Sequence, residues 1–197
     1  MVHIGIIIGS TRPGRRGADV AHWVLDQASK RHDATFEIID LVDHPLPHLD
    51  EAMPPRLVQY EREHTRQWSA HISRFDGFVI VTPEYNHAPP AVLKNALDFL
   101  FHEWANKAVG FVGYGAVGGA RAVEQLRLVA GELQLADVQA QVALSLYTDF
   151  EAFATLTPQP AQEAAVETLL DQVVAWSEAL APLREAAREP VAAGASR

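Results

Sequence analysis

Residues 9–17 combine glycines, hydroxyl side chains and arginines in one short segment. Ser10 and Thr11 supply hydroxyl donors, and Arg12 and Arg16 supply guanidinium groups, whose forked donors suit anionic oxygens. The protein as a whole is acidic, so this concentration of arginine stands out against its surroundings. These residue types in this arrangement predict an anion site, and the expected ligand carries a phosphate.

The elements on either side of this segment explain how it would hold an anion. The apolar, β-branched run over 2–8 predicts a strand buried on both faces, and the pattern over 18–31 predicts a helix. A glycine-containing turn lets the backbone approach a ligand, and the start of a helix presents unpaired N–H groups. We therefore expect the backbone N–H groups near Gly17 and Ala18 to complete the phosphate cradle.

Two better-known phosphate loops fit these residues less well. Gly9 and Gly14 have the spacing of a Walker loop, but Arg15 and Arg16 stand where lysine and a magnesium-binding hydroxyl are needed. Only the second half of the dinucleotide fingerprint is present, although Asp40 is an acceptable ribose-binding acid. A terminal phosphate monoester fits best. An ordinary strand-to-helix turn with a solvated basic cluster stays open as the simpler interpretation.

Composition limits the classes of protein that the chain can belong to. Its 197 residues and 48% apolar content suit one globular domain. The net charge of −9 opposes general nucleic-acid binding and adsorption to anionic membranes, and the absence of cysteine excludes thiolate chemistry. No segment approaches the ~20 apolar residues of a membrane span, and no signal-peptide pattern is present. We expect a cytoplasmic protein that acts on small molecules.

Strand and helix patterns alternate five times along the chain. This alternation predicts an α/β fold with a parallel sheet in the order 2-1-3-4-5 and helices on both faces. The domain is expected to span 1–185, followed by a flexible tail over 186–197. The predicted strands are 3–8, 35–41, 76–82, 108–113 and 137–146, and the predicted helices are 18–31, 57–75, 90–101, 120–135 and 161–183.

Three unusual loops fall at the carboxyl ends of adjacent strands in this sheet. They are 10–17 after the first strand, 83–89 after the third and the glycine-rich turn 114–119 after the fourth. Ligands of open parallel sheets bind outside the carboxyl ends of the strands, near the point where the strand order reverses. The order 2-1-3-4-5 therefore predicts that these loops form one site.

The second of these loops carries a specific family pattern. Pro-Glu-Tyr-Asn at 83–86, followed by Leu-Lys-Asn-Ala-Leu-Asp at 93–98, resembles the NADPH-dependent FMN reductase family of flavodoxin-like proteins. The first and third loops agree with this family, and the resemblance covers 2–146. Ala91 stands where many members have glycine, and Arg15-Arg16-Gly17 differs from the serine- or asparagine-containing loops of some relatives.

This resemblance implies a flavodoxin-like three-layer sandwich and an oxidoreductase that contains FMN. NADPH or NADH would serve as co-substrate, and hydride would pass through flavin N5 to free flavin, a quinone, an azo compound or a similar small acceptor. The chemistry would belong to the flavin, so no catalytic acid, base or nucleophile and no metal is expected. The family also implies a homodimer or a dimer of dimers.

The resemblance assigns two groups of residues to the flavin. Ser10, Thr11, Arg12, Arg16, Gly17 and Ala18 would hold the phosphate. The ring would be held by Pro83, Glu84, Tyr85, Asn86, Tyr114 and Gly115. Pro83 and Tyr85 are expected to form a rigid wall, and Tyr114 and Gly115 to close the pyrimidine end. Glu84 is more readily explained as a helix cap or an intersubunit partner than as a catalytic group.

Several residues have simpler roles that stay open. Lys94 and Asp98 have the spacing of a helical ion pair, and His87 is either a substrate contact or an exposed loop residue. The apolar stretch 99–104 is expected at a subunit interface, with core packing as the alternative. Trp68 and Trp176 are expected to pack against the sheet.

Two other functions remain as alternatives to the reductase. One is a flavodoxin-type electron carrier that does not oxidise NAD(P)H itself, although the arginines of the first loop oppose it. The other is a binding module that has lost its flavin. The histidines His44 and His48 are the densest cluster, but Pro45 and Pro47 interrupt any helix between them, so we expect no metal there. The segment 41–56 is expected to be a flexible rim over the flavin.

Overall fold

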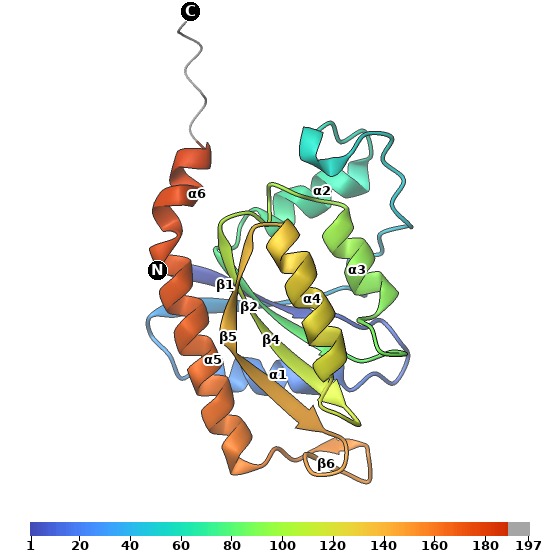
Figure 1. Cartoon of the computed structure of the whole chain (residues 1–197), viewed down its shortest axis with the longest axis vertical. Helices are drawn as coiled ribbons and strands as arrows, with labels where there is room; N and C mark the ends of the chain where they lie inside the picture. Colours follow the sequence, from blue (N-terminus) through green and yellow to red (C-terminus); the bar gives the residue numbers. More distant parts are fainter. Residues whose placement is uncertain (189–197) are drawn as a thin grey trace, which may run out of the picture.

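The computed structural model describes residues 1–188, which form a five-stranded parallel sheet between two layers of helices (Figure 1). The strand order β2-β1-β3-β4-β5 confirms the predicted topology. The strands are β1 (Val2–Ile8), β2 (Ala34–Asp40), β3 (Gly77–Pro83), β4 (Lys107–Gly115) and β5 (Leu135–Ser145).

Helices cover both faces of this sheet and divide the core into two clusters. On one face lie α1 (Gly17–Ala28) and α5 (Pro160–Ala179), whose apolar side chains pack on the sheet. On the other lie α2 (Glu63–Ile72), α3 (Ala91–Asp98) and α4 (Ala120–Glu132). Burial of apolar surface on both sides explains why the central strands are almost uniformly hydrophobic.

The register of the sheet brings the carboxyl ends of three strands together. Ile8 of β1 pairs with Val81 of β3, and Pro83 of β3 pairs with Tyr114 of β4. Because these strands are adjacent and parallel, the segments that follow them leave the same edge. The predicted convergence of the three loops is therefore a property of the observed sheet.

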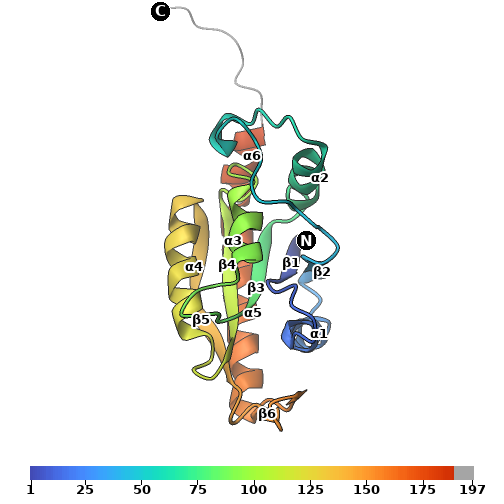
Figure 2. The same ribbon diagram turned by 90° about the vertical axis from the view of Figure 1, so that its right-hand side faces the viewer.

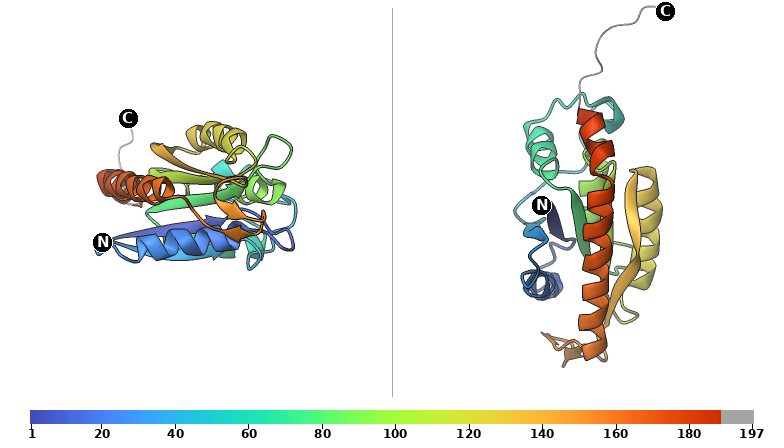
Figure 3. Two further views of the ribbon diagram at one scale, coloured as in Figure 1. Left: turned by 90° about the horizontal axis from the view of Figure 1, so that it is seen from below. Right: turned by 90° about the vertical axis from the view of Figure 1, so that its left-hand side faces the viewer.

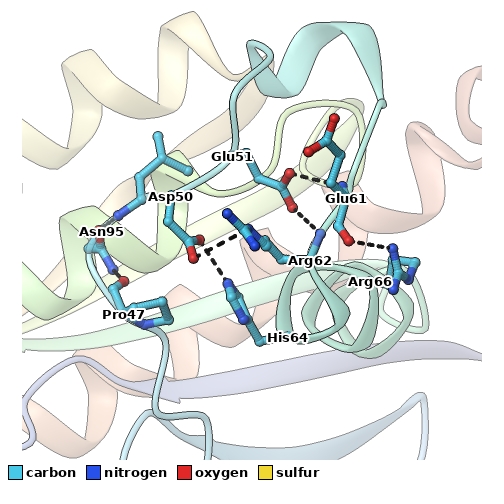
Figure 4. Close-up of polar contacts among 9 residues, drawn as sticks. Pro47, Asp50, Glu51, Glu61, Arg62, His64, Arg66 and Asn95 are labelled. Atoms are coloured by element: carbon cyan, nitrogen blue, oxygen red, sulfur yellow. Dashed lines mark hydrogen bonds and ion pairs between the residues drawn. The ribbon is translucent and has the colours of Figure 1, made fainter.

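The predicted helix over 57–75 is wrong in its first third. A short 3₁₀ helix, η1 (Pro55–Leu57), ends at Val58 with a φ of 52°, and α2 begins only at Glu63. The carboxylate of Glu51 accepts the backbone N–H groups of Glu61 at 2.9 Å and Arg62 at 3.0 Å (Figure 4). These bonds satisfy backbone donors just before the helix, and a partner ten residues away cannot be read from helical periodicity.

Residues 42–62, which we call the strap, cross from the end of β2 to the start of α2 (Figure 2). Both polar atoms of the Asn95 side-chain amide, on α3, bond backbone groups of the strap. Its Nδ2 donates to the carbonyl of Pro47 at 2.7 Å, and its Oδ1 accepts the N–H of Leu49 at 3.0 Å (Figure 4). Asp50 pairs with His64 at 2.9 Å. The strap therefore lies against α3 through specific bonds, and its role as a flexible rim over the flavin stays a prediction.

The end of the chain differs from the prediction in two places. β4 continues to Gly115, so the first two residues of the predicted turn belong to the strand. The predicted helix over 161–183 is divided into α5 and α6 (Ala181–Arg188), which continue along one line in Figure 1. Of the predicted tail, residues 186–188 lie in α6, and 189–197 lie outside the described residues.

A hairpin between β5 and α5 was not predicted. Its strands are β6 (Phe150–Glu151) and β7 (Thr155–Leu156). Ala152 and Phe153 both have positive φ, at 50° and 58°, as the centre of a type I′ turn requires. This geometry normally selects asparagine and glycine, so alanine and phenylalanine at these positions carry no turn signal.

Two expectations for aromatic residues need correction. Trp104, Phe99 and Leu100 are almost fully buried within the chain, so the stretch 99–104 packs in the core and does not offer these side chains to an interface. Trp68 is buried as expected, and its Nε1 donates to the carbonyl of Ala96 at 2.9 Å. Trp176 is 47% exposed and does not pack fully against the sheet.

Candidate functional site

The candidate site lies where β1, β3 and β4 end. We call residues 9–16 the first loop, 83–90 the second loop and 114–119 the third loop, so that the last residues of β3 and β4 are counted with the segments that follow them. The N–H of Gly9 donates to the carbonyl of Val81 at 2.9 Å, which holds the start of the first loop beside β3. A side chain at Gly9 would overlap Leu93 and the Val81 carbonyl, so glycine is required for this close approach.

A pair of hydroxyl groups joins the first and second loops. Ser10 is 1% exposed, and its Oγ lies 2.7 Å from the Oη of Tyr85, forming a hydrogen bond. The guanidinium of Arg12 lies over the Tyr85 ring, 5.8 Å from its centroid, which is a cation–π contact. The structure therefore brings together three predicted site residues, although Tyr85 lies 75 positions beyond Ser10 in the sequence.

Arg15 and Asp40 form an ion pair that the sequence did not reveal. The Arg15 Nη2 donates to the Asp40 carboxylate, and both side chains are mostly buried. The other Asp40 oxygen accepts the N–H of Val42 at 3.0 Å. Asp40 is thus occupied and is poorly placed to bind a ribose, which weakens the dinucleotide interpretation. The Nε of Arg15 is buried and has no partner among the described residues.

The first loop ends at the start of α1. Arg16 is the N-cap residue, and its carbonyl accepts the N–H of Val20 at 3.1 Å. Its partly buried side chain makes no hydrogen bond or ion pair with the described residues and lines a surface cavity. Gly17 is buried, and a Cβ there would lie 2.8 Å from the Oη of Tyr114. Thr11 and Ala18 are partly exposed beside this turn.

The second loop is a tight turn with special backbone geometry. Asn86 and His87 have φ values of 51° and 69°. Tyr85 and Ala88 exchange backbone hydrogen bonds of 2.9 and 3.1 Å around them. Positive φ at both central residues defines a type I′ turn, and asparagine tolerates it well. The Asn86 side chain is exposed, so it is available to a ligand.

Four contacts clamp this turn to α4. The Glu84 carboxylate is 7% exposed, accepts the N–H of Arg121 at 3.1 Å and pairs with the Arg121 guanidinium. Arg121 also bonds His87 at 2.7 Å, and Gln125 donates to the His87 carbonyl. Burial raises the pKa of Glu84, but the bonds from Arg121 outweigh it and leave the pKa lowered. Glu84 is therefore a helix cap, and the sequence could not identify its partner.

Tyr114 connects the third loop to the first. Its side chain is buried, and its hydroxyl faces Gly17 at the start of α1. Burial, reinforced by Tyr85, raises the pKa of Tyr114, so the phenol is neutral. The carbonyl of Gly115 accepts the N–H groups of Gly118 at 3.1 Å and Leu146 at 3.0 Å. The side chain of Tyr114 thus supports the first loop, a role beyond the backbone contact that we expected.

The chemistry of the first loop fits a phosphate monoester. Hydroxyls, guanidinium groups and backbone N–H groups gather there, and the carboxylate of Asp40, at the end of β2, is neutralised by Arg15. Gly14 has a φ of 69° and open space around it, so the backbone remains accessible. Glu84 serves as a cap, so the edge offers no free carboxylate among the predicted residues. Such a site can hold a cofactor that carries its own chemistry.

Within residues 1–188, no three histidine or carboxylate side chains are grouped so that they could hold a metal ion. Nor does any helix there combine the length and apolar character of a membrane span.

The sheet order and the loops at its carboxyl edge define a flavodoxin-like α/β protein with a cofactor site. Comparison with known proteins agrees. A flavoenzyme NAD(P)H:(acceptor) oxidoreductase of Paracoccus denitrificans, FerB, superposes with a TM-score of 0.70 at 19% identity, covering 91% of this chain and 98% of that one. The chain belongs to the NADPH-dependent FMN reductase family, whose sequence profile matches residues 2–149.

Individual relatives support this membership. The chain is 41% identical over 146 residues to an NAD(P)H-dependent FMN reductase of Schizosaccharomyces pombe, which covers 73% of each protein. It is 33% identical over 141 residues to a 2-hydroxy-1,4-benzoquinone reductase of a Burkholderia species, covering 67% of this chain and 72% of the relative. The expected class, an oxidoreductase using FMN and NAD(P)H, is confirmed.

Proposed function

We propose that the three loops bind FMN and that the protein uses NADPH or NADH to reduce a small planar acceptor. Free flavin, quinones and azo compounds are the acceptor classes proposed. The observation that carries this proposal is the contact of Ser10 and Arg12 with Tyr85. These contacts join an anion-binding loop to a loop with an aromatic ring, as a ligand with a phosphate at one end and a flat ring system at the other would need.

The phosphate is assigned to the first loop and the start of α1. Thr11 and Arg12 supply donors from the side facing solvent, and Ser10 supplies a buried hydroxyl. The backbone at Gly17 and Ala18 adds the field of a helix N-terminus, and Arg16 adds positive charge at the outer side. Since Arg15 neutralises Asp40, the loop keeps the charge that a phosphate dianion needs.

The ring is assigned to the second and third loops. Pro83 and Tyr85 form a wall whose position is fixed by the type I′ turn and by Ser10. The Asn86 side chain is exposed beside this wall, and the backbone at Tyr114 and Gly115 borders the opposite end. Glu84 acts indirectly, because its bonds to α4 hold the turn in place. FMN held by these residues would supply the redox chemistry, with hydride taken from the reduced nicotinamide and electrons passed to the acceptor.

Anaerobic bleaching tests this function directly. The purified protein, loaded with FMN, is mixed with NADH or NADPH, and the flavin absorbance is followed before acceptors are added. We expect rapid bleaching, followed by recovery of the absorbance when a quinone, free FMN or an azo dye is supplied. Flavin that binds but is not bleached would indicate an electron carrier instead, and failure to bind flavin would indicate a binding module.

We also propose a homodimer or a dimer of dimers in the cytoplasm. Exposed apolar side chains on the strap support an association surface there, namely Leu49, Met53, Leu57 and Val58. Light scattering coupled to size-exclusion chromatography tests this assembly, and a Leu57→Glu variant should shift it toward the monomer. A monomeric wild-type protein would contradict it.

A further inference from the structure

A cavity of about 520 Å³ lies between α1 and the β6–β7 hairpin. Its volume falls in the range typical of small-molecule sites. Figures 2 and 3 show the hairpin extending from the end of β5 toward α1. One wall comes from the outer face of α1 with its N-cap residue Arg16, and the other includes Thr155 and Leu156. Because Arg16 ends the first loop, the cavity adjoins the proposed flavin phosphate.

The helical wall presents a regular row of chemically distinct groups. Arg16, Asp19, Trp23 and Asp26 are spaced by three, four and three residues, so they lie along one side of the helix. Trp23 is partly buried against the core and supplies an aromatic surface. The side chains of Arg16, Asp19 and Asp26 make no hydrogen bond or ion pair with any other described residue. They are therefore available to a ligand.

The position of Asp26 is unfavourable for the helix itself. It lies in the last turn of α1, where the helix dipole repels a carboxylate, and no basic residue lies in that turn. The hairpin that supplies the opposite wall carries a local penalty at its turn, outside the cavity lining, since Phe153 is a bulky residue with positive φ. The hairpin is nevertheless held firmly: Asp149, 1% exposed, accepts the N–H groups of Ser145 at 2.9 Å and Gln159 at 3.1 Å.

We infer that this cavity binds the adenosine half of the nicotinamide dinucleotide and selects NADH over NADPH. Trp23 stacks on adenine, Asp19 accepts the ribose hydroxyls, Asp26, two helical turns further on, accepts the adenine amino group, and Arg16 binds the adjoining phosphate. One arginine faces two carboxylates here, so a 2′-phosphate would meet repulsion whereas a 2′-hydroxyl donates a hydrogen bond. This inference rests on the proposed function, because the cavity holds the adenosine end of the same co-substrate whose nicotinamide end reacts at the proposed flavin site.

Binding of adenosine fragments tests the site without any redox step. Isothermal titration of the purified protein with 5′-AMP and with 2′,5′-ADP compares the two adenosine halves. We expect 5′-AMP to bind about ten-fold more tightly, as the repulsion of one charged group predicts. The double variant Asp19→Asn, Asp26→Asn should lose or reverse this preference, and Glu178→Gln, on exposed α5, should keep it.

Steady-state kinetics give a second test with a built-in control for folding. Reduced nicotinamide mononucleotide lacks adenosine, so it cannot use the cavity. Trp23→Leu should raise the KM for NADH about ten-fold and leave the KM for the mononucleotide unchanged. The double asparagine variant should raise the KM for NADH and lower the KM for NADPH.

Clear results would overturn the inference. The first is that 5′-AMP does not bind. The second is that Trp23→Leu changes the KM for NADH and the KM for the mononucleotide equally. The third is that the double asparagine variant moves the KM for NADH and the KM for NADPH in the same direction. Absence of 5′-AMP binding would contradict the adenosine site alone. Absence of bleaching by either dinucleotide would contradict the proposed function alone, since fragment binding needs no hydride transfer.

Discussion

Tyr85 is the residue on which the proposed flavin site converges. Its hydroxyl bonds Ser10, its ring lies under the Arg12 guanidinium, and its backbone closes the turn that presents Asn86. One side chain thus fixes the spacing between the loop assigned to the phosphate and the loop assigned to the ring. Positioning a cofactor through such contacts is the main contribution that a flavoprotein makes to the chemistry of its flavin.

Arg12→Ala should weaken FMN binding about 10- to 100-fold. The exposed guanidinium is the charged donor assigned to the phosphate, and hydrogen bonds to charged groups are worth about 1.5–3 kcal/mol. Quenching of FMN fluorescence on titration measures the change. Arg74→Ala, which removes an exposed arginine of the Glu37 ion pair, is the matched control and should bind FMN normally. Unchanged affinity in Arg12→Ala would refute the phosphate assignment.

Glu84→Gln should lower the free energy of unfolding by about 1–3 kcal/mol at neutral pH, since a buried charged bond to Arg121 is lost. The folded-state pKa of Glu84 is lowered, so its stabilising effect is present above the ordinary carboxyl pKa and is lost as the pH falls through the lowered value. Urea unfolding from pH 7 to pH 3 measures this. The exposed Glu63–Arg66 pair gives the control, and Glu63→Gln should change little. A constant difference across this pH range would contradict the assignment.

At the scale of single residues, the sequence indicated the candidate site residues, but it did not indicate which side chains pair with one another. Ser10, Arg12 and Tyr85 could be chosen because their types and loop positions have chemical meaning. The Arg15–Asp40 and Glu84–Arg121 pairs could not, because each joins residues from separate elements and depends on the packing of the sheet. Likewise, nothing local to Tyr114 indicates that its hydroxyl reaches Gly17.

Among the elements, the parallel strands were predictable because burial on both faces leaves continuous apolar runs. The errors fall where local geometry departs from simple periodicity. The strap depends on Asn95 and Glu51, which bond backbone groups far along the chain. The β6–β7 hairpin depends on a turn built from Ala152 and Phe153, residues that rarely adopt positive φ.

The hairpin turn offers a test of its strain. Replacing Ala152→Asn together with Phe153→Gly should raise the melting temperature by about 2–4 °C, because both residues suit a type I′ turn and about 1 kcal/mol is recovered. Differential scanning calorimetry measures the shift. Ala154→Gly, next to the turn, should instead lower the melting temperature, since no positive φ is relieved there. A decrease in the double variant would mean that the turn is not strained.

Over the whole molecule, acidification should weaken the fold through a pair of histidines. The rings of His44, at the start of the strap, and His71 of α2 lie 4.6 Å apart between centroids. Burial lowers the pKa of both, and the neighbouring His44 lowers the pKa of His71 further. Asp40 and Asp43 oppose this shift at His44 only in part.

The direction of the effect follows from these lowered pKa values. Both rings are neutral in the folded protein near pH 7, and the unfolded chain takes up protons first as the pH falls below about 6.5. Stability should therefore decrease between pH 7 and pH 5, as urea unfolding can measure. His71→Gln should reduce this decrease, whereas His22→Gln, at an exposed position on α1, should retain it. Identical pH profiles for wild type and His71→Gln would exclude this pair as the cause.

The strand order has a consequence for the synthesis of the protein. The loops assigned to FMN follow β1, β3 and β4, so the first leaves the ribosome well before the last. A nascent chain that ends before β4 has neither Tyr114 beneath Gly17 nor Arg121 to clamp the second loop. Cofactor capture must then wait until most of the sheet has assembled, and incomplete chains would remain without flavin. Acquisition of the yellow colour would thus report a chain translated past its fourth strand.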